Sequence, residues 1–225
     1  MRIAVLGTGP VGQTVAAKLA DLGHEVTIGT RDPVATLART EPDIFGNPPF
    51  STWLEAHPQV PLVVLAEAAS SGDVVVNATS GAGSIAALEA AGEDNLAGKV
   101  LVDLANPLDF SQGMPPSLFV SNTDSLGEQI QRRFPQARVV KALNTMNAYL
   151  MVDPGQLAGG DHTVFVAGND ADAKSTVREL LSSFGWSDIV DLGDITSARG
   201  TEMYVALWLR LFALGSPMFS VKVVR

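Results

Sequence analysis

The chain has 225 residues, 46% of them hydrophobic and 17% charged, with no cysteine and a formal net charge of -9. This composition is too apolar for a disordered protein, and the lack of cysteine excludes disulfide scaffolds, thiolate metal sites and thiol nucleophiles. An acidic chain without a basic patch is atypical of a nucleic-acid-binding protein, and a chain of this length forms one large domain or two small ones.

The chain opens with the pattern of a strand, a helix and a second strand. Residues 3–6 are a short apolar run, residues 10–22 carry apolar side chains at helical spacing, and residues 26–29 are a second apolar run. Gly23 is positioned to end the helix. Two strands joined through a helix in about thirty residues predict a parallel β-α-β unit with a right-handed crossover.

The same alternation continues to residue 150. Further strands are predicted over residues 62–65, 74–78, 99–104 and 138–142. Further helices are predicted over residues 31–39, 66–71, 84–91 and 124–134. Residues 41–61 are rich in proline and polar residues, so we expect a loop there with a helical turn near Trp53. The alternation predicts an α/β fold of the Rossmann type, with a doubly wound, largely parallel sheet covered on both faces.

After residue 150 the pattern changes. We expect a strand over residues 163–167, a helix over 171–184, a short strand over 189–190 and a long apolar helix over 196–214. We therefore divide the chain into a Rossmann domain, residues 1–150, and a small C-terminal α/β domain, residues 151–225, that packs on the first.

Neither end of the chain predicts export or membrane insertion. The first apolar run is too short for a signal peptide. The apolar stretch over residues 203–221 contains Arg210 and is broken by Gly215 and Pro217, which favours a buried helix and a turn over a membrane span. We expect a cytoplasmic protein that binds neither nucleic acid nor membrane.

A glycine-rich hexad joins the first predicted strand to the first helix. It reads Gly7-Thr8-Gly9-Pro10-Val11-Gly12. In this context the first glycine permits a tight turn, the second lets the backbone approach a pyrophosphate, and the third lets helix and strand pack closely. The free N–H groups and the dipole at the helix start attract an anion. The hexad thus predicts a dinucleotide site, and the alternative is a structural turn without a ligand.

The residues after the second strand indicate which dinucleotide binds. NAD-binding proteins place an acidic residue there for the ribose 2′-hydroxyl. This chain has Thr30, which offers a hydroxyl, and Arg31, which offers a planar fork of donors suited to a phosphate. Asp32 follows and is positioned to cap the next helix before Pro33. We therefore expect NADP rather than NAD, and the alternative for Arg31 is a solvated surface arginine.

Two more loops follow predicted strands and are candidates for cofactor contact. They contain Ala78, Thr79 and Ser80 in one and Asn106 and Pro107 in the other. In a doubly wound sheet, ligands bind beyond the carboxyl ends of the strands. Thr79 and Ser80 can donate hydrogen bonds to a phosphate or a ribose. The alternative is that both segments are plain loops.

The sequence offers no catalytic acid or base and no metal site. His24, His57 and His162 lack partners at metal or triad spacing, and we expect all three at the surface. Lys141 is expected to form a salt bridge at a strand end. Carbonyl reduction requires a proton donor at the developing alkoxide, whereas hydride transfer between two bound heterocyclic cofactors mainly requires orientation and exclusion of water. The absence of a catalytic residue therefore favours the second kind of reaction.

Five segments, taken in order, resemble the NADPH:F420 oxidoreductase family over nearly the whole chain. They are the glycine hexad, the Gly-Thr-Arg of residues 29–31, residues 103–107, residues 141–148 and the Pro-Met-Phe of residues 217–219. The resemblance implies a Rossmann domain, a C-terminal domain that closes a cleft, and hydride transfer between NADPH and the deazaflavin coenzyme F420 in that cleft.

The resemblance also implies roles for individual residues. The hexad would hold the pyrophosphate, and Thr30 and Arg31 the 2′-phosphate. The nicotinamide and the deazaflavin would lie near Ala142, Asn144, Thr145 and Met146. Parts of the last helix, around Arg199, Glu202 and Met203, would face the cleft.

One departure from the family leaves the acceptor open. Its members carry a Pro-Trp-Glu-His type of segment after the fourth strand, where residues 79–83 of this chain read TSGAG. The alternatives are an NADPH-dependent reductase of a flavin, quinone or metal chelate, and a non-catalytic NADP(H)-sensing module. The apolar helix over residues 203–214 suits either the core or a dimer face, and the resemblance favours a homodimer.

Overall fold

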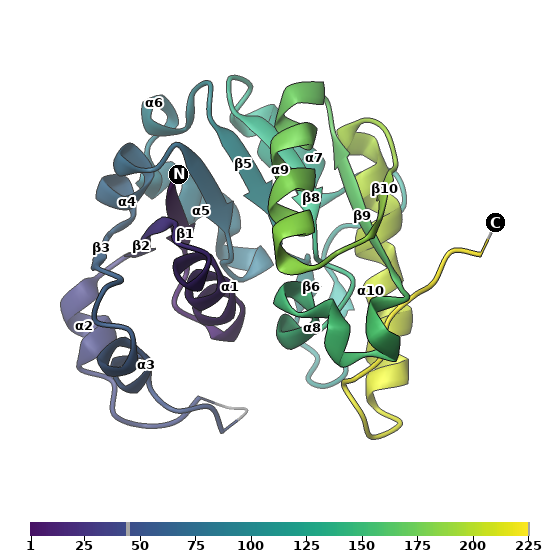
Figure 1. The fold of residues 1–225 in the computed structure, drawn as a ribbon, viewed down its shortest axis with the longest axis horizontal. Helices are drawn as coiled ribbons and strands as arrows, with labels where there is room; N and C mark the ends of the chain where they lie inside the picture. Colours follow the sequence, from purple (N-terminus) through teal and green to yellow (C-terminus); the bar gives the residue numbers. More distant parts are fainter. Residues whose placement is uncertain (44–45, 225) are drawn as a thin grey trace.

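A computed structural model of the chain describes residues 1–43 and 46–224 (Figure 1). Within this part of the chain the main sheet has eight strands in the order β10-β9-β8-β5-β4-β1-β2-β3. The strands are β1 (Arg2–Leu6), β2 (Glu25–Thr30), β3 (Leu62–Val64), β4 (Val74–Asn77), β5 (Val100–Asp103), β8 (Arg138–Ala142), β9 (Thr163–Gly168) and β10 (Asp188–Asp191). The six strands from β3 to β8 are parallel and have the Rossmann strand order, so the predicted fold is confirmed.

Helices cover both faces of this sheet (Figure 1). Six of them pack on the sheet with buried residues in its two cores: α1 (Pro10–Asp21), α4 (Leu65–Ser71), α5 (Gly81–Ala91), α7 (Leu126–Arg133), α9 (Ala171–Phe184) and α10 (Ala198–Phe212). Further helices are α2 (Pro33–Leu37), α3 (Phe50–Ala56), α6 (Glu93–Leu96) and α8 (Ala148–Val152). Each helix and strand predicted from the sequence is present to within three residues at each end, whereas α6 and α8 were not predicted.

Residues after 150 extend the same sheet instead of forming a separate one. β9 pairs antiparallel with β8, where Val140 lies opposite Gly168, and β10 pairs parallel with β9. A separate two-stranded hairpin of β6 (Leu108–Asp109) and β7 (Ser117–Leu118) follows β5. The division of the chain into two domains at residue 150 stays a prediction.

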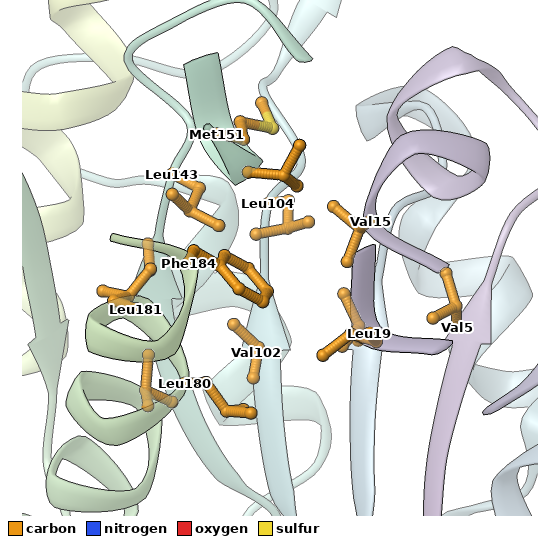
Figure 2. Close-up of a cluster of buried hydrophobic side chains, with 14 of the residues drawn as sticks. Val5, Val15, Leu19, Val102, Leu104, Leu143, Met151, Leu180, Leu181 and Phe184 are labelled. Carbon is orange, nitrogen blue, oxygen red and sulfur yellow. The ribbon is translucent and has the colours of Figure 1, made fainter. Parts of the chain in front are cut away.

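Apolar side chains alternate between the two faces of the sheet and build one core on each. In β1, Ile3 and Val5 belong to the first core, and Ala4 and Leu6 to the second. The first core lies under α1, α8 and α9, as Figure 2 shows for Val5, Val15, Leu19, Val102, Leu104, Leu143, Met151, Leu180, Leu181 and Phe184. The second core lies under α4, α5 and α7. The predicted cover on both faces is therefore confirmed.

The prediction of a buried C-terminal helix is wrong for the second half of α10. Thr201, Glu202 and Val205 in its first half are buried, but Leu207 is 55% exposed and Leu214, just beyond the helix, is 83% exposed. In the second half Trp208 stacks on Phe212 and meets Phe219 of the C-terminal segment, whereas Leu207, Leu211 and Phe212 stay 37% to 55% exposed. In the part of the chain that the structure describes, no helix has both the length and the apolarity needed to cross a membrane. The expected homodimer stays a prediction.

The expected surface position of His162 is also wrong. Its side chain is buried at the start of β9, its Nε2 lies 3.0 Å from the carbonyl oxygen of Pro154, and its ring meets that of Trp186 edge-on. A single histidine next to a strand carries no sequence signal of this tertiary packing. His24 and His57 are half-buried.

Candidate functional site

A cavity of about 440 Å³ lies beyond the carboxyl ends of β1, β2 and β4. This is where the strand order reverses, since β2 and β3 lie on one side of β1 and the chain then crosses from β3 to β4 on its other side. Of the residues predicted from the sequence, the cavity is lined by Gly7, Thr8, Gly9, Thr30, Arg31, Ala78, Thr79 and Ser80. The fold thus brings together three segments that are far apart in the sequence.

The three glycines of the hexad have the geometry that their predicted roles require. Gly7 has a φ of +121°, and a Cβ on it would lie 2.6 Å from the carbonyl oxygen of Ala78. A Cβ on Gly12 would lie 2.2 Å from the carbonyl oxygen of Gly7, so only glycine lets α1 start this close to β1. A Cβ on Gly9 would meet nothing within 4 Å, and this opening lies on the cavity wall. The backbone there is accessible to a ligand.

The start of α1 presents backbone donors next to this opening. Gly9 is the N-cap and Pro10, which has no N–H group, is the first residue of the helix. The first N–H groups of a helix have no partner inside it, so the start of α1 attracts an anion. The Gln13 side-chain amide donates to the Thr8 carbonyl oxygen at 2.9 Å and holds the turn in place. Pro10 is exposed, Val11 packs partly against the core, and Gly12 is buried.

Two arginines give the far end of the cavity a positive charge. Arg31, for which 2′-phosphate binding stays a prediction, lines this end, and Arg39, which follows α2, lines the same cavity. Arg39 was not singled out from the sequence because its position depends on the length and direction of α2. Asp32 also lines the cavity, and one of its carboxylate oxygens accepts the Ala35 N–H at 2.9 Å, which confirms its predicted role as N-cap of α2.

The hydroxyl proton of Thr30 is committed to a neighbouring side chain. The Thr36 hydroxyl lies 2.7 Å from the carbonyl oxygen of Asp32, which can only accept, so Thr36 donates its one proton there. The Thr30 hydroxyl, 3.0 Å from that of Thr36, must then donate to it. The guanidinium groups of Arg31 and Arg39 are therefore the side chains at this end that can donate freely to a phosphate.

Pro10, Val11 and Gly12 are not among the residues that line this cavity, and neither are the predicted residues beyond the next strands. Ala142, Asn144, Thr145 and Met146 follow or end β8 and are buried, with exposed fractions of 1% to 6%. Asn106 and Asn144 hydrogen-bond to each other. The Asn106 side-chain amide donates to the Asn144 backbone carbonyl oxygen, and the Asn144 side-chain amide donates to Asn106 Oδ1, each at 2.9 Å. Pro107 is buried beside Asn106. A role of these residues near a nicotinamide stays a prediction.

Lys141 forms the predicted salt bridge, and it does so in full burial. Its ammonium lies 2.8 Å from Asp103 Oδ2 and 2.8 Å from Glu202 Oε1, and it also donates to the carbonyl oxygen of Ala105. The two Glu202 oxygens accept the Leu126 and Gly127 N–H groups at the start of α7. Burial lowers the pKa of Lys141, but the two carboxylates outweigh it and raise the pKa above its ordinary value.

The other two residues that the resemblance placed at a cleft have separate surroundings. Arg199 pairs with Glu128 through its guanidinium, and this hydrogen bond holds the pKa of the Glu128 carboxyl below its ordinary value. Met203 is 39% exposed on α10. Glu202 faces Lys141 and α7 instead of solvent.

Comparisons with known proteins connect this architecture to one family. The family described as NADP oxidoreductase, coenzyme F420-dependent, matches residues 2–107. The chain is 28% identical to the F420-dependent NADP reductase of Methanothermobacter marburgensis, over 94% of this chain and 92% of that protein. It is 30% identical to the rat metalloreductase STEAP3 over 93% of this chain, but it spans only 37% of that protein's length.

A solved structure is similar over almost the full length. The crystal structure of a proposed F420-dependent NADP reductase from Arthrobacter sp. FB24 superposes with a TM-score of 0.95 and 66% sequence identity. The match covers 99% of each chain. The likeness therefore includes the cavity and the residues after position 150.

Proposed function

Because this chain belongs to the family of coenzyme F420-dependent NADP oxidoreductases, we propose that it transfers a hydride between NADPH and the deazaflavin coenzyme F420. It is an NADP-dependent oxidoreductase, as its relatives are. The observation that carries the deazaflavin proposal is the likeness to F420-dependent NADP reductases over both whole chains, at 92% coverage or more of each relative.

The cavity fits NADP. Gly9 leaves its backbone open, the start of α1 supplies N–H groups for the pyrophosphate, and Arg31 and Arg39 supply donors for the 2′-phosphate. When bound, NADPH supplies a hydride from its nicotinamide ring. In this proposal the chain itself binds and orients the two cofactors and excludes water, and no side chain acts as a dedicated acid or base.

Two glycine substitutions separate folding from cofactor binding. Gly9→Ala adds a methyl group where no protein atom lies within 4 Å, so we expect a change in unfolding free energy below about 0.5 kcal/mol. The same methyl group faces the proposed pyrophosphate, so NADPH affinity should fall at least about tenfold. Gly12→Ala forces a Cβ against the Gly7 carbonyl and should cost about 1–3 kcal/mol of stability. Chemical denaturation and NADPH titration of both variants measure the two effects, and equal stability losses would contradict these roles.

The deazaflavin proposal is tested by anaerobic mixing of the purified protein with NADPH and oxidised coenzyme F420. Loss of the deazaflavin absorbance should be fast with NADPH and slow with NADH. FMN in place of F420 is the parallel control and should be reduced slowly. Tight NADPH binding without deazaflavin bleaching would contradict the proposed acceptor and leave the NADP site standing.

A second candidate function is reduction of a different acceptor by NADPH. It is favoured by the 30% identity to the metalloreductase STEAP3, of which this chain spans 37%. The same assay with FMN or a ferric chelate distinguishes it, because turnover with those acceptors and none with F420 would support it. NADPH binding without oxidation by any acceptor would instead indicate a sensing module.

A further inference from the structure

A buried chain of hydrogen bonds connects Lys141 to the cavity wall. Lys141 bonds to one oxygen of Asp103, and the other oxygen accepts the Asn77 side-chain amide at 2.8 Å. The Asn77 carbonyl oxygen, Oδ1, lies 2.6 Å from the Thr79 hydroxyl and 3.3 Å from the Thr79 N–H. Lys141, Asp103 and Asn77 are at most 1% exposed, whereas Thr79 lines the cavity. These hydrogen bonds thus connect the protein interior to the cavity where the cofactor is proposed to bind.

In this series of hydrogen bonds, which group donates and which accepts is fixed at every step. An ionised carboxylate only accepts hydrogen bonds, and the ammonium of Lys141 keeps Asp103 paired with a positive charge. Asn77 must therefore turn its NH₂ group toward Asp103, which leaves its carbonyl oxygen facing Thr79. A contact of 2.6 Å between that oxygen and the Thr79 hydroxyl requires a proton between them, and only Thr79 owns one.

The neighbouring Ser84 does not free the Thr79 hydroxyl proton for a hydrogen bond to the cofactor. Ser84 is fully buried, and its hydroxyl lies 2.8 Å from that of Thr79. The Ser84 oxygen also accepts the Asn77 side-chain amide at 3.2 Å. Since the Thr79 proton already goes to Asn77, Ser84 can donate its own proton only to Thr79 or to the Ser80 carbonyl oxygen. What the Thr79 hydroxyl retains is a lone pair.

We propose that the Lys141–Asp103–Asn77 chain makes the Thr79 hydroxyl an obligate hydrogen-bond acceptor, which binds a ribose hydroxyl of the cofactor and not a phosphate. The inference rests on the proposed NADPH function. Ionised phosphate oxygens only accept hydrogen bonds, so a lone pair there repels them, whereas a sugar hydroxyl can donate. Lys141, Asp103 and Asn77 are positioning residues in this scheme, because they act on the cofactor only through Thr79.

The test compares Thr79→Val with Thr79→Ser, which keeps the hydroxyl. The probes are NADPH and three analogues, each lacking one of its free ribose hydroxyls. Thr79→Val should weaken NADPH binding about three- to tenfold, and Thr79→Ser should restore most of it. One of the three analogues should bind wild type and Thr79→Val equally, because it lacks the hydroxyl that donates.

Equal losses by Thr79→Val for NADPH and for all three analogues would overturn the inference, since they would indicate a structural role or a phosphate contact. No loss for NADPH would overturn it as well. A wild-type protein that binds no NADPH would overturn the proposed function and this inference together, so the two failures are distinguishable.

The effect of Lys141, Asp103 and Asn77 on the Thr79 hydroxyl is tested by Asp103→Asn. The new amide keeps its oxygen toward Lys141 and turns its NH₂ group toward Asn77, which must then flip and free the Thr79 proton. Because a ribose hydroxyl can also accept, the probe for this variant carries fluorine in place of the sensitive hydroxyl, which accepts weakly and cannot donate. We expect Asp103→Asn to discriminate less than wild type between NADPH and this fluorinated analogue. Asp73→Asn is the matched control, because Asp73 precedes β4, at the end of the strand opposite Asn77, and is half exposed. An Asp103→Asn variant that discriminates against the fluorinated analogue as strongly as wild type does would overturn the role proposed for these residues.

Discussion

Replacement of both Arg31 and Arg39 by alanine should weaken NADPH binding by about a hundredfold or more and leave NADH binding nearly unchanged. Each guanidinium lines the cavity end where the 2′-phosphate is proposed to bind, and a hydrogen bond to a charged group contributes about 1.5–3 kcal/mol. Thr30, at the same end, has already committed its proton to Thr36 and cannot compensate. Titration of each variant with both nucleotides measures the effect.

The single variants show how the two arginines divide this role. Arg31→Lys keeps the charge but loses the planar fork, so a loss close to that of Arg31→Ala would indicate bidentate phosphate binding. Arg132 on α7 is the control, because it pairs with Asp124 and is not among the cavity residues. Equal losses for NADPH and NADH in the double variant would mean that neither arginine reads the 2′-phosphate.

Lys141→Met should lower the unfolding free energy by about 3–5 kcal/mol. The substitution removes the one positive charge between Asp103 and Glu202 and leaves two carboxylates in full burial, with side chains 0% and 2% exposed. Chemical denaturation measures the loss. Lys174→Met is the control, because Lys174 pairs with the partly exposed Asp191 and should cost less than about 1 kcal/mol. Similar losses for the two variants would contradict the importance of the buried cluster.

The pH dependence of this loss has a defined sign. The pKa of Lys141 is raised in the folded protein, so its contribution is fully present below the ordinary lysine pKa of 10.5. It disappears only as the pH rises through the higher folded value. The stability difference between wild type and Lys141→Met should therefore be constant from neutral pH to about pH 10 and shrink above it.

The sequence predicted the fold well because its signals are local. Each strand of the Rossmann order is a short apolar run between turn residues, and the glycine hexad and the Asp32 cap lie within a few residues of the groups they serve. These features depend on backbone geometry over a few neighbouring residues. Periodicity and capping rules are suited to them.

The features that could not be predicted from the sequence depend on contacts between residues that are far apart along the chain. Arg39 reaches the cavity only because α2 turns it back toward Arg31, and Glu202 meets Lys141 only because α10 packs on α7. The second half of α10 is apolar yet exposed, because an apolar pattern does not say whether anything covers it. His162 shows the reverse case of a polar side chain buried by tertiary packing.

The antiparallel pairing of β9 with β8 has a consequence for how the cavity can open. Proteins that close over a cofactor often swing two bodies about a hinge, and the hinge must then lie where few backbone bonds cross. Here such a swing of residues 163–191 would have to break the ladder between Val140–Ala142 and Val166–Gly168. We therefore expect opening and closing to involve the loops around the strand ends, while the sheet moves as one rigid piece.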